Sequence, residues 1–352
     1  MTYLLCVNLD INDKNIERNL RFKNTLRGIR SVSKTNNKVV ILAHRGRPSR
    51  KDSKLSLKSF VGPLSKGLRK KVIFVTDFNF PKISKQIAQS QNGSVFLLEN
   101  LRFIPGEAKA SKGLAKSLAL LGDKFINDDF PTSHHKNASN FELPKLLPSM
   151  LGENFKLELR QLDKIMRKPK RPLVLIIGGA KTSDKLGIVK NFLSKADSIL
   201  LGGGPANTML KARGVHIGKS LYDKKALLQI KDLSNKEKVV TPVDWEVEKD
   251  LILDIGPETI KLYGGAIKGA KTIVWNGPMG KFEYKSFDRG TNALHKAVLA
   301  QKTANILIGG GETLSAIPPL EKTQKHVFVS SGGGAMLTYL SGAKLPAIEA
   351  IK

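Results

Sequence analysis

The feature that most constrains the fold of this chain is a series of short apolar runs separated by segments with helical spacing. The runs are rich in Val, Ile and Leu, and they read TYLLCVNL, KVVILAH, KVIFVTDF, SVFLLEN, KFIND, PLVLIIGG, SILLGGG, KVVTPVD, TIVWNG, ILIGGG and HVFVSS. Such runs are typical of strands buried on both faces, and helices between them indicate parallel pairing. The pattern predicts an α/β fold with doubly wound, Rossmann-like parallel sheets.

The length of the chain predicts two such domains. Its 352 residues exceed the ~250 to 300 at which a single core usually stops growing. Between the fifth and sixth runs, LGENFKLELRQLDKIMRKPKRP has apolar positions at helical spacing and ends in prolines. We therefore expect one domain over residues 1–150, a hinge helix within 151–170 and a second domain over 171–340.

The charge of the chain is strongly positive, because 59 Lys and Arg against 30 Asp and Glu give a net charge of +29. Nucleic-acid binding, a basic cleft for a small polyanion and a lysine-rich solvated surface are three interpretations of such a charge. The excess is spread along the chain, and only 6% of the residues are aromatic and able to stack on bases. We expect no specific nucleic-acid partner, although nonspecific binding through the charge stays open.

The single cysteine, Cys6, cannot form an internal disulfide, which favours a reducing compartment. No run approaches the ~18 apolar residues of a membrane span, and the start MTYLLCVNLD does not resemble a secretory leader. The sequence therefore predicts a cytoplasmic protein with no membrane partner.

Glycines follow four of the predicted strands of the second domain, at positions 178–179, 202–204, 309–311 and 332–334. One glycine pair could be a tight turn or a helix C-cap. Four clusters at strand ends favour a nucleotide or phosphate platform, since backbone N–H groups can approach an anion there. Neither G-x-G-x-x-G nor a complete Walker loop accounts for them, and GVHIGKSL at 214–221, one residue short of a Walker loop, is predicted to be a turn or a strand entry.

Two lysines, Lys181 and Lys185, follow the first of these glycine clusters. A helix that begins soon after Gly179 would place both on one face near its N-terminus. Cations are repelled there unless an anion is bound, so the pair is interpreted as a phosphate site, with two solvated lysines as the alternative.

Nine motifs of the chain resemble those of the phosphoglycerate kinase family, in the family's order. They read AHRGRP, LLENLRF, INDDF, GGAKTSDKL, LLGGGPANTML, DIGP, WNGPMGKFE, IGGGET and SSGGGAML. The resemblance covers nearly the whole chain. It implies two doubly wound domains, a C-terminal segment (341–352) that returns to the first domain, and reversible phosphoryl transfer between 1,3-bisphosphoglycerate and Mg-ADP, giving 3-phosphoglycerate and Mg-ATP. It also implies a monomer.

The resemblance places the acid substrate on the first domain and the nucleotide on the second. The implied acid-binding residues are Asn8, Asp10, Arg21, His44, Arg47, Arg102, His135 and Lys136. The implied nucleotide-binding residues are Gly179, Lys181, Lys185, Gly203, Asn276, Glu283, Gly310, Gly311, Glu312 and Thr313. Arg21, Lys181, Gly311 and Gly334 are implied to act in the transfer, and Glu312 to assist a Mg²⁺ carried mainly by the nucleotide.

Some of these assignments have alternatives. Arg21 lies in a basic segment in which Arg27 or Arg30 could be mere surface charges, and only the resemblance selects Arg21. His44 could be a strand-end histidine satisfied by backbone, and Glu283 could cap a loop.

The chain also departs from the family's pattern. Asn8 and Asp10 exchange the usual aspartate and asparagine, His135 replaces an arginine with Lys136 beside it, and Glu312 replaces an aspartate. A neutral imidazole lacks the arginine fork, so we expect weaker binding of the acid unless Lys136 substitutes. The alternative function is a nucleotide-binding homologue with a weakened acid site that acts as a binding or regulatory protein.

Overall fold

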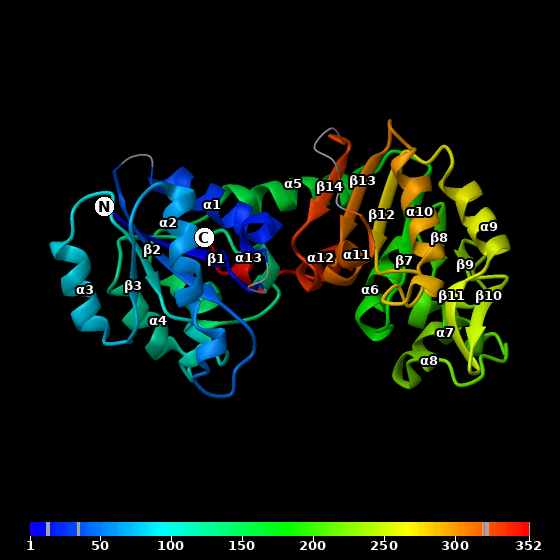
Figure 1. Ribbon diagram of the computed structural model, residues 1–352, viewed down its shortest axis with the longest axis horizontal. Helices are drawn as coiled ribbons and strands as arrows, with labels where there is room; N and C mark the ends of the chain where they lie inside the picture. The colour runs from blue at the N-terminus through cyan, green and yellow to red at the C-terminus, as the bar shows by residue number, and fades with distance from the viewer. Residues whose placement is uncertain (12–14, 34–35, 319, 321–323, 352) are drawn as a thin grey trace. The chain divides into compact units, whose positions relative to one another are not determined.

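The computed structural model describes residues 1–11, 15–33, 36–318, 320 and 324–351 (Figure 1). The chain forms two compact units. The first comprises residues 1–159 and 344–352, and the second comprises residues 160–343. The division falls inside helix α5 (Glu153–Arg167).

The first unit is built on a six-stranded parallel sheet with the order β3-β4-β2-β1-β5-β6. Its strands are β1 (Thr2–Asn8), β2 (Lys38–His44), β3 (Val72–Val75), β4 (Val95–Leu98), β5 (Lys124–Asn127) and β6 (Ser149–Leu151). Alternate side chains of β1 feed two cores, because successive residues of a strand point to opposite faces. Leu4 and Cys6 pack with α3 and α4, whereas Leu5 and Val7 pack with α1 and α2.

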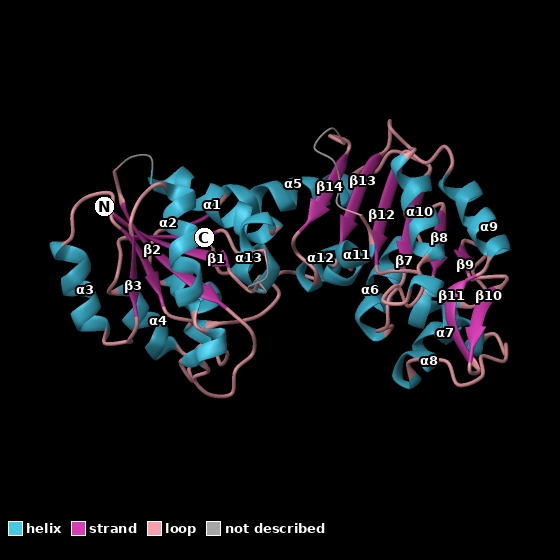
Figure 2. Cartoon of the chain, in the orientation of Figure 1, coloured by secondary structure: helices cyan, strands magenta, loops and turns pink. Residues whose placement is uncertain are grey.

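Helices therefore cover both faces of this sheet, as the cyan and magenta elements of Figure 2 show. The helices are α1 (Leu20–Ser33), α2 (Val61–Leu68), α3 (Phe80–Gln89), α4 (Lys112–Ala119) and α13 (Pro346–Glu349). Short helical turns are η1 (Ile16–Arg18), η2 (Ser53–Leu55), η3 (Leu57–Phe60), η4 (Leu101–Phe103), η5 (Phe130–Thr132), η6 (Ala138–Glu142) and η7 (Leu143–Lys145). The α13 segment is held to the unit by a hydrogen bond from Ala347 N to Ser133 O, 3.2 Å.

The second unit has a six-stranded parallel sheet with the order β14-β13-β12-β7-β8-β9, and a separate antiparallel pair, β10-β11. The strands are β7 (Leu173–Ile177), β8 (Ser198–Leu201), β9 (Val239–Val240), β10 (Trp245–Glu248), β11 (Leu251–Ile255), β12 (Thr272–Asn276), β13 (Asn305–Gly309) and β14 (Val327–Ser330). The completely buried Trp275 packs in a core with Tyr263 and Leu294 from two helices.

The helices of the second unit are α6 (Ser183–Phe192), α7 (Gly203–Ala212), α8 (Lys224–Ile230), α9 (Pro257–Ile267), α10 (Arg289–Leu299), α11 (Gly311–Ala316) and α12 (Gly334–Leu340), with turns η8 (Lys231–Leu233) and η9 (Lys285–Phe287). Helices α9 and α10 supply the core around Trp275. On the other side, Gly309 at the end of β13 adjoins Met336 of α12.

The predicted fold class is confirmed, since both main sheets are parallel and doubly wound. Each of the eleven predicted runs contains a strand. The predicted runs omit β6 and the β10-β11 pair. Five of the six strands of the first sheet were therefore predicted. The segment 214–221, predicted to be a turn or a strand entry, is largely irregular, with turn residues at Gly214 and Lys219 and an isolated bridge between Gly218 and Leu251.

Candidate functional site

The sheet of the first unit reverses its winding between β1 and β5, and polar side chains gather at that point. The order continues to β2 on one side of β1 and to β5 on the other. In doubly wound sheets, ligands bind beyond the carboxyl ends of the strands at this switch. There β1 ends at Asn8, β2 ends at His44, and Asp128 and Asp129 follow β5.

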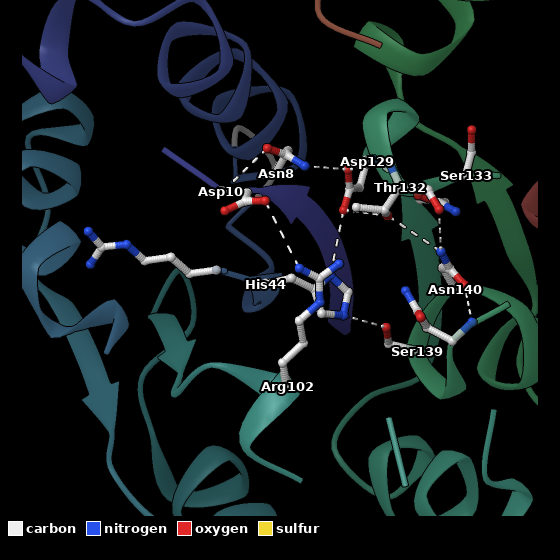
Figure 3. Close-up of polar contacts among 12 residues, drawn as sticks. Asn8, Asp10, His44, Arg102, Asp129, Thr132, Ser133, Ser139 and Asn140 are labelled. Carbon is white, nitrogen blue, oxygen red and sulfur yellow. Dashed lines mark hydrogen bonds and ion pairs between the residues drawn. The ribbon is translucent and has the colours of Figure 1, made fainter. Parts of the chain in front are cut away.

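His44 is completely buried and lies between two carboxylates. Its Nε2 is 2.6 Å from Glu107 Oε1. Its Nδ1 is 3.7 Å from Asp129 Oδ2, an ion pair longer than a hydrogen bond (Figure 3). Burial lowers the pKa of His44, but the contacts with Asp129 and Glu107 more than offset it and raise the pKa to about 9. His44 is therefore an imidazolium at neutral pH, held beneath the surface rather than on it.

Asp129 is also completely buried, and three donors hold its carboxylate. Asn8 Nδ2 donates to Oδ1 at 3.0 Å, Thr132 N donates to Oδ1 at 3.3 Å, and Thr132 Oγ1 donates to Oδ2 at 2.8 Å (Figure 3). Burial raises the pKa of Asp129, but contacts with His44, Asn8 and Thr132 outweigh it and lower the pKa. The carboxylate is therefore ionised.

Glu107 completes this buried cluster. Ser139 Oγ donates to Glu107 Oε1 at 2.5 Å, and Ser139 N donates to Oε2 at 3.2 Å. Sequence reasoning missed both Glu107 and Asp129. The position of Asp129 directly after a buried strand, in INDDF, was a signal for it, whereas no sequence pattern marks Glu107.

Asp10 links the buried cluster, through Asn8, to the guanidinium groups of Arg21 and Arg102. Its N donates to Asn8 Oδ1 at 3.3 Å, and its Oδ1 accepts from Gly46 N at 2.8 Å. Its Oδ2 lies 4.0 Å from an Arg102 guanidinium nitrogen (Figure 3). Its backbone O accepts from Arg21 at 2.9 Å. One residue thus connects three segments of the unit.

Among the arginines of α1, the structure distinguishes Arg21 from its neighbours. Arg21 donates to Asp10, whereas Arg27 donates to Asn24 and Arg30 donates to the carbonyl of Gly67. Of these three arginines, Arg21 is therefore the one that contacts Asp10.

Arg47, Arg102 and His135 form the outer part of the site. Arg47 is exposed, and Arg102 is partly buried and donates to Gly46 O. Burial lowers the pKa of His135, and the charges of Arg47 and Arg102 lower it further. His135 is therefore a neutral ring beside two guanidinium groups.

His135 stacks on His134, with ring centroids 3.9 Å apart. Burial, followed by the neighbouring His135, lowers the pKa of His134 to about 4, so this ring is neutral as well. Lys136 does not replace the missing arginine fork in this arrangement, because its Nζ lies 5.0 Å from the Phe141 ring centroid in a cation–π contact.

The second unit has its own switch point, between β7 and β12, and a cavity of about 350 Å³ opens there. Glycines that follow β7 and β8 line it together with the segment after β12. The lining residues are Gly179, Ala180, Gly203, Gly204, Ala206, Asn207, Leu221, Pro242, Leu251, Ile252, Leu253, Asp254, Ile255, Pro278, Met279, Gly280, Lys281, Phe282, Glu283 and Glu312. Its walls combine apolar side chains with glycine turns and a few polar side chains, a composition suited to a nucleotide.

The glycine at position 310 is required by the turn after β13. Its φ is +102°, and a Cβ there would lie 2.5 Å from Asn276 Nδ2. Asn276 itself donates to Gly309 O at 2.7 Å and is nearly buried, and Thr313 Oγ1 accepts from Gly277 N at 2.6 Å. Asn276 and Thr313 thus hold the turns of the site in place.

Lys181 and Lys185 do not share a helix face, and this corrects the sequence-based expectation. Helix α6 begins only at Ser183, whose N donates to Asp223 Oδ2 at 2.9 Å. Lys181 is exposed in the preceding turn. Lys185 is buried and donates to Gly178 O.

Burial lowers the pKa of Lys185, while the carboxylates of Glu312 and Asp184 oppose this effect. A Cβ on Gly179 would lie 2.6 Å from Lys185 Nζ and 2.7 Å from Glu312 Oε2. A cation and a carboxylate therefore flank Gly179. Glu312 and Glu283 are both exposed at the cavity.

The remaining predicted glycines lie at helix starts or beside the cavity. Gly203 begins α7, Gly311 begins α11 and Gly334 begins α12, and Gly179 lines the cavity. A Cβ on Gly311 would meet nothing within 4 Å, so this N-terminus is open to an anion.

Within the described ranges, no three His, Cys, Asp or Glu side chains are placed together to hold a metal ion. Nor does the described part of the chain include a helix long and apolar enough to cross a membrane.

Comparison with known proteins gives one family. The family model for phosphoglycerate kinase matches residues 5–343. Phosphoglycerate kinase of Macrococcus caseolyticus is 38% identical over 371 aligned positions, covering 98% of this chain and 94% of the relative, and that of Staphylococcus haemolyticus is 37% identical with the same coverage.

Two solved structures share the fold over almost the whole chain. Phosphoglycerate kinase from Coxiella burnetii has a TM-score of 0.83 and 33% identity, and covers 99% of this chain and 95% of its own. The enzyme from Pyrococcus horikoshii OT3 has a TM-score of 0.85 and 30% identity, with the same coverage.

Two doubly wound units, one with a cluster of arginines and histidines and one with a glycine-lined cavity, define a phosphotransferase that uses a nucleotide. More specifically, the chain belongs to the phosphoglycerate kinase family.

Proposed function

We propose that the first unit of this chain binds 3-phosphoglycerate and 1,3-bisphosphoglycerate, that the second binds Mg-ATP and Mg-ADP, and that α5 is the hinge helix between them. The observation that carries this proposal is that each unit has its own anion-binding features at the switch point of its sheet. Arginines and histidines gather in the first, and glycine turns with a buried lysine gather in the second.

On the acid side, Arg21, Arg47 and Arg102 are the proposed anion ligands. Each guanidinium can make charge-assisted hydrogen bonds to a carboxylate or phosphate, worth about 1.5 to 3 kcal/mol each. His135 and Lys136 keep their proposed places near the acid, but a neutral ring and an ammonium engaged with Phe141 supply less charge than an arginine. Weaker binding of the acid than in relatives with an arginine follows.

On the nucleotide side, the cavity would hold the base and ribose, with Glu283 facing the ribose. Gly179, Gly203, Gly310 and Gly311 would let the backbone come close to the phosphates because they lack a Cβ, and the first N–H groups of α11, which begins at Gly311, would face them. Lys185 would lie on the phosphates, because it is already held next to Gly179. Asn276 and Thr313 would act by fixing the turns rather than by touching the ligand.

A magnesium ion fits this donor set in one way. Mg²⁺ is usually held by one or two carboxylates and substrate phosphates, and Glu312 is the one of the two exposed glutamates at the cavity that adjoins Gly179. Glu312 would therefore contribute one oxygen to an ion carried by the nucleotide. The ion would supply neutralisation of charge on the phosphate oxygens.

The chemistry of transfer needs no general base, since the attacking oxygen of ADP or of the carboxylate is already anionic. What the chain must supply is positioning and positive charge for the transferring phosphoryl group. We propose that Arg21 and the exposed Lys181 supply this positive charge. The N–H groups of Gly311 and Gly334, at the starts of α11 and α12, would donate to the same phosphoryl group.

Separate KM values for the acid and for ATP test the assignment of one ligand to each unit. In a coupled assay of ATP consumption with 3-phosphoglycerate, Arg47→Ala should raise KM for the acid ~10-fold or more, as expected for a lost charged hydrogen bond, and leave KM for ATP unchanged. Arg50→Ala, in the same exposed loop, is the matched control. Equal effects of Arg47→Ala on both KM values would contradict the assignment of the acid to this unit.

We also propose a cytoplasmic monomer, in keeping with the single buried Cys6. Light scattering of the purified chain measures its mass directly, and a value of twice 38.6 kDa would refute the monomer.

A further inference from the structure

We propose that Asp129 is a positioning residue for the acid substrate, acting through Asn8 on Asp10, and that Asp10 rather than Asn8 faces the ligand. This inference rests on the proposed function of the first unit and adds to it. Neither the family's motifs nor the sequence pattern assigned a role to Asp129.

Both ends of the Asn8 side chain are already engaged. Its Nδ2 donates to Asp129 Oδ1 at 3.0 Å, and its Oδ1 accepts from Asp10 N at 3.3 Å. Its residue exposure is only 6%. A side chain committed at both ends and nearly buried is poorly placed to bind a ligand directly, although the sequence predicted that it would.

The direction of the Asn8 amide is set by its two partners. Asp129 is an ionised, buried carboxylate, so it can only accept, and Asp10 N can only donate. A flipped amide would place oxygen against oxygen at one end and N–H against N–H at the other. Because Asp129 is fixed in turn by Thr132 and His44, the buried cluster imposes one orientation on Asn8.

The consequence reaches the ligand surface through Asp10. With its N held by Asn8, Asp10 presents one carboxylate oxygen to Gly46 N at 2.8 Å and the other toward Arg102 at 4.0 Å. Its backbone O accepts a hydrogen bond from the Arg21 guanidinium. The side chain of Asp10 keeps 43% exposure, so it can accept from a donor such as a hydroxyl group while it holds the arginine.

Exchange of donor and acceptor between positions 8 and 129 tests the contact. Asn8→Asp alone would set two carboxylates about 3 Å apart in a buried place, and we expect KM for 3-phosphoglycerate to rise ~10-fold or more. Asn8→Asp with Asp129→Asn restores one donor and one acceptor and keeps the acceptor for Asp10 N. This double variant should have a lower KM for the acid than Asn8→Asp alone.

Loss of the carboxylate tests the effect on the ligand. Asp129→Ala should raise KM for 3-phosphoglycerate ~10-fold, with KM for Mg-ATP changed less than about twofold, since only the acid site is disturbed. In an Asp10→Ala background, Asp129→Ala should add little, because its route to the ligand is gone. Asp77→Ala, an exposed carboxylate of the same unit, is the control that should change neither KM.

If the changes in KM for 3-phosphoglycerate caused by Asn8→Asp and by Asp129→Asn simply multiply in the double variant, the inference is overturned. An unchanged KM for the acid in Asp129→Ala would overturn it as well. If Asp129→Ala does not fold, the isosteric exchange decides alone. Failure of the unaltered chain to bind 3-phosphoglycerate in calorimetry would instead refute the proposed function, and this inference with it.

Discussion

A rise in pH should weaken the first unit by removing the charge of His44. Burial lowers the pKa of this imidazole, but Asp129 and Glu107 raise it from 6.5 to about 9 in the folded chain. The folded state keeps a proton that the unfolded state releases between those values. The stabilisation is therefore complete below pH 6.5 and is lost as the pH rises through 9.

The size of the effect follows from the same interval. At about 1.4 kcal/mol for each pH unit, the difference between 6.5 and about 9 corresponds to roughly 3 kcal/mol of opening free energy. That is a large part of the ~5 to 15 kcal/mol that stabilises a typical domain.

Cys6 offers a direct assay for this unit. It is the only cysteine of the sequence, it is completely buried in β1, and burial raises the pKa of its thiol, so the folded chain should not react. Maleimide labelling then requires opening, and the labelling rate divided by that of the unfolded chain gives the opening free energy. Between pH 6.5 and 9.5 this free energy should fall by roughly 3 kcal/mol, about a hundredfold in relative rate.

His44→Gln is the control, because it keeps a polar side chain of similar length that does not titrate. The ratio of the two labelling rates cancels the pH dependence of the thiol reaction itself. If both chains lose the same opening free energy over this range, His44 is not the group responsible and its charged state in the cluster is wrong.

Three further outcomes follow from the sites. Lys181→Ala should lower kcat roughly 10²-fold in the coupled assay, since one preorganised charge is lost, whereas Lys190→Ala, at the exposed end of α6, should not; a near-normal kcat would remove Lys181 from the mechanism. His135→Arg should lower KM for 3-phosphoglycerate ~10-fold by adding a planar fork beside the other guanidinium groups, and an unchanged or higher KM would speak against the weakened acid site. Gly310→Ala should weaken Mg-ADP binding in calorimetry by at least ~10-fold, because of its φ of +102° and the contact with an amide; Gly265→Ala, whose Cβ would meet nothing within 4 Å, is the matched change, and equal affinities would refute the need for glycine.

Most of the fold could be predicted because buried parallel strands leave a strong local pattern. Strands such as β2 and β12 are buried at nearly every position, since both faces of the sheet are covered, and each contains consecutive apolar residues. β6 is different, because its three residues at the sheet edge are partly or fully exposed. β10 and β11 form an antiparallel pair outside the main sheets, and β10 has no buried residue to mark it.

The residues of the candidate site were predictable only where they lie at strand ends or in motifs. Asn8 and His44 end their strands, so their location followed from the fold. The contacts that determine what they do come from distant parts of the chain, since Glu107 lies 63 positions and Asp129 lies 121 positions from their partners. Local periodicity carries no information on such pairs. The resemblance implied that His44 binds the acid substrate, but it gave no indication of the two buried carboxylates, Glu107 and Asp129, that contact it.

The path of the chain also has a consequence for biosynthesis. Residues 344–352 belong to the first unit, where Ala347 N donates to Ser133 O, yet all of residues 160–343 precede them on the ribosome. Domains generally fold as they emerge, N-terminal parts first. Here the unit that begins to emerge first receives its last segment only after the whole of the other unit has been translated, so its final consolidation is expected to be a late, post-translational event.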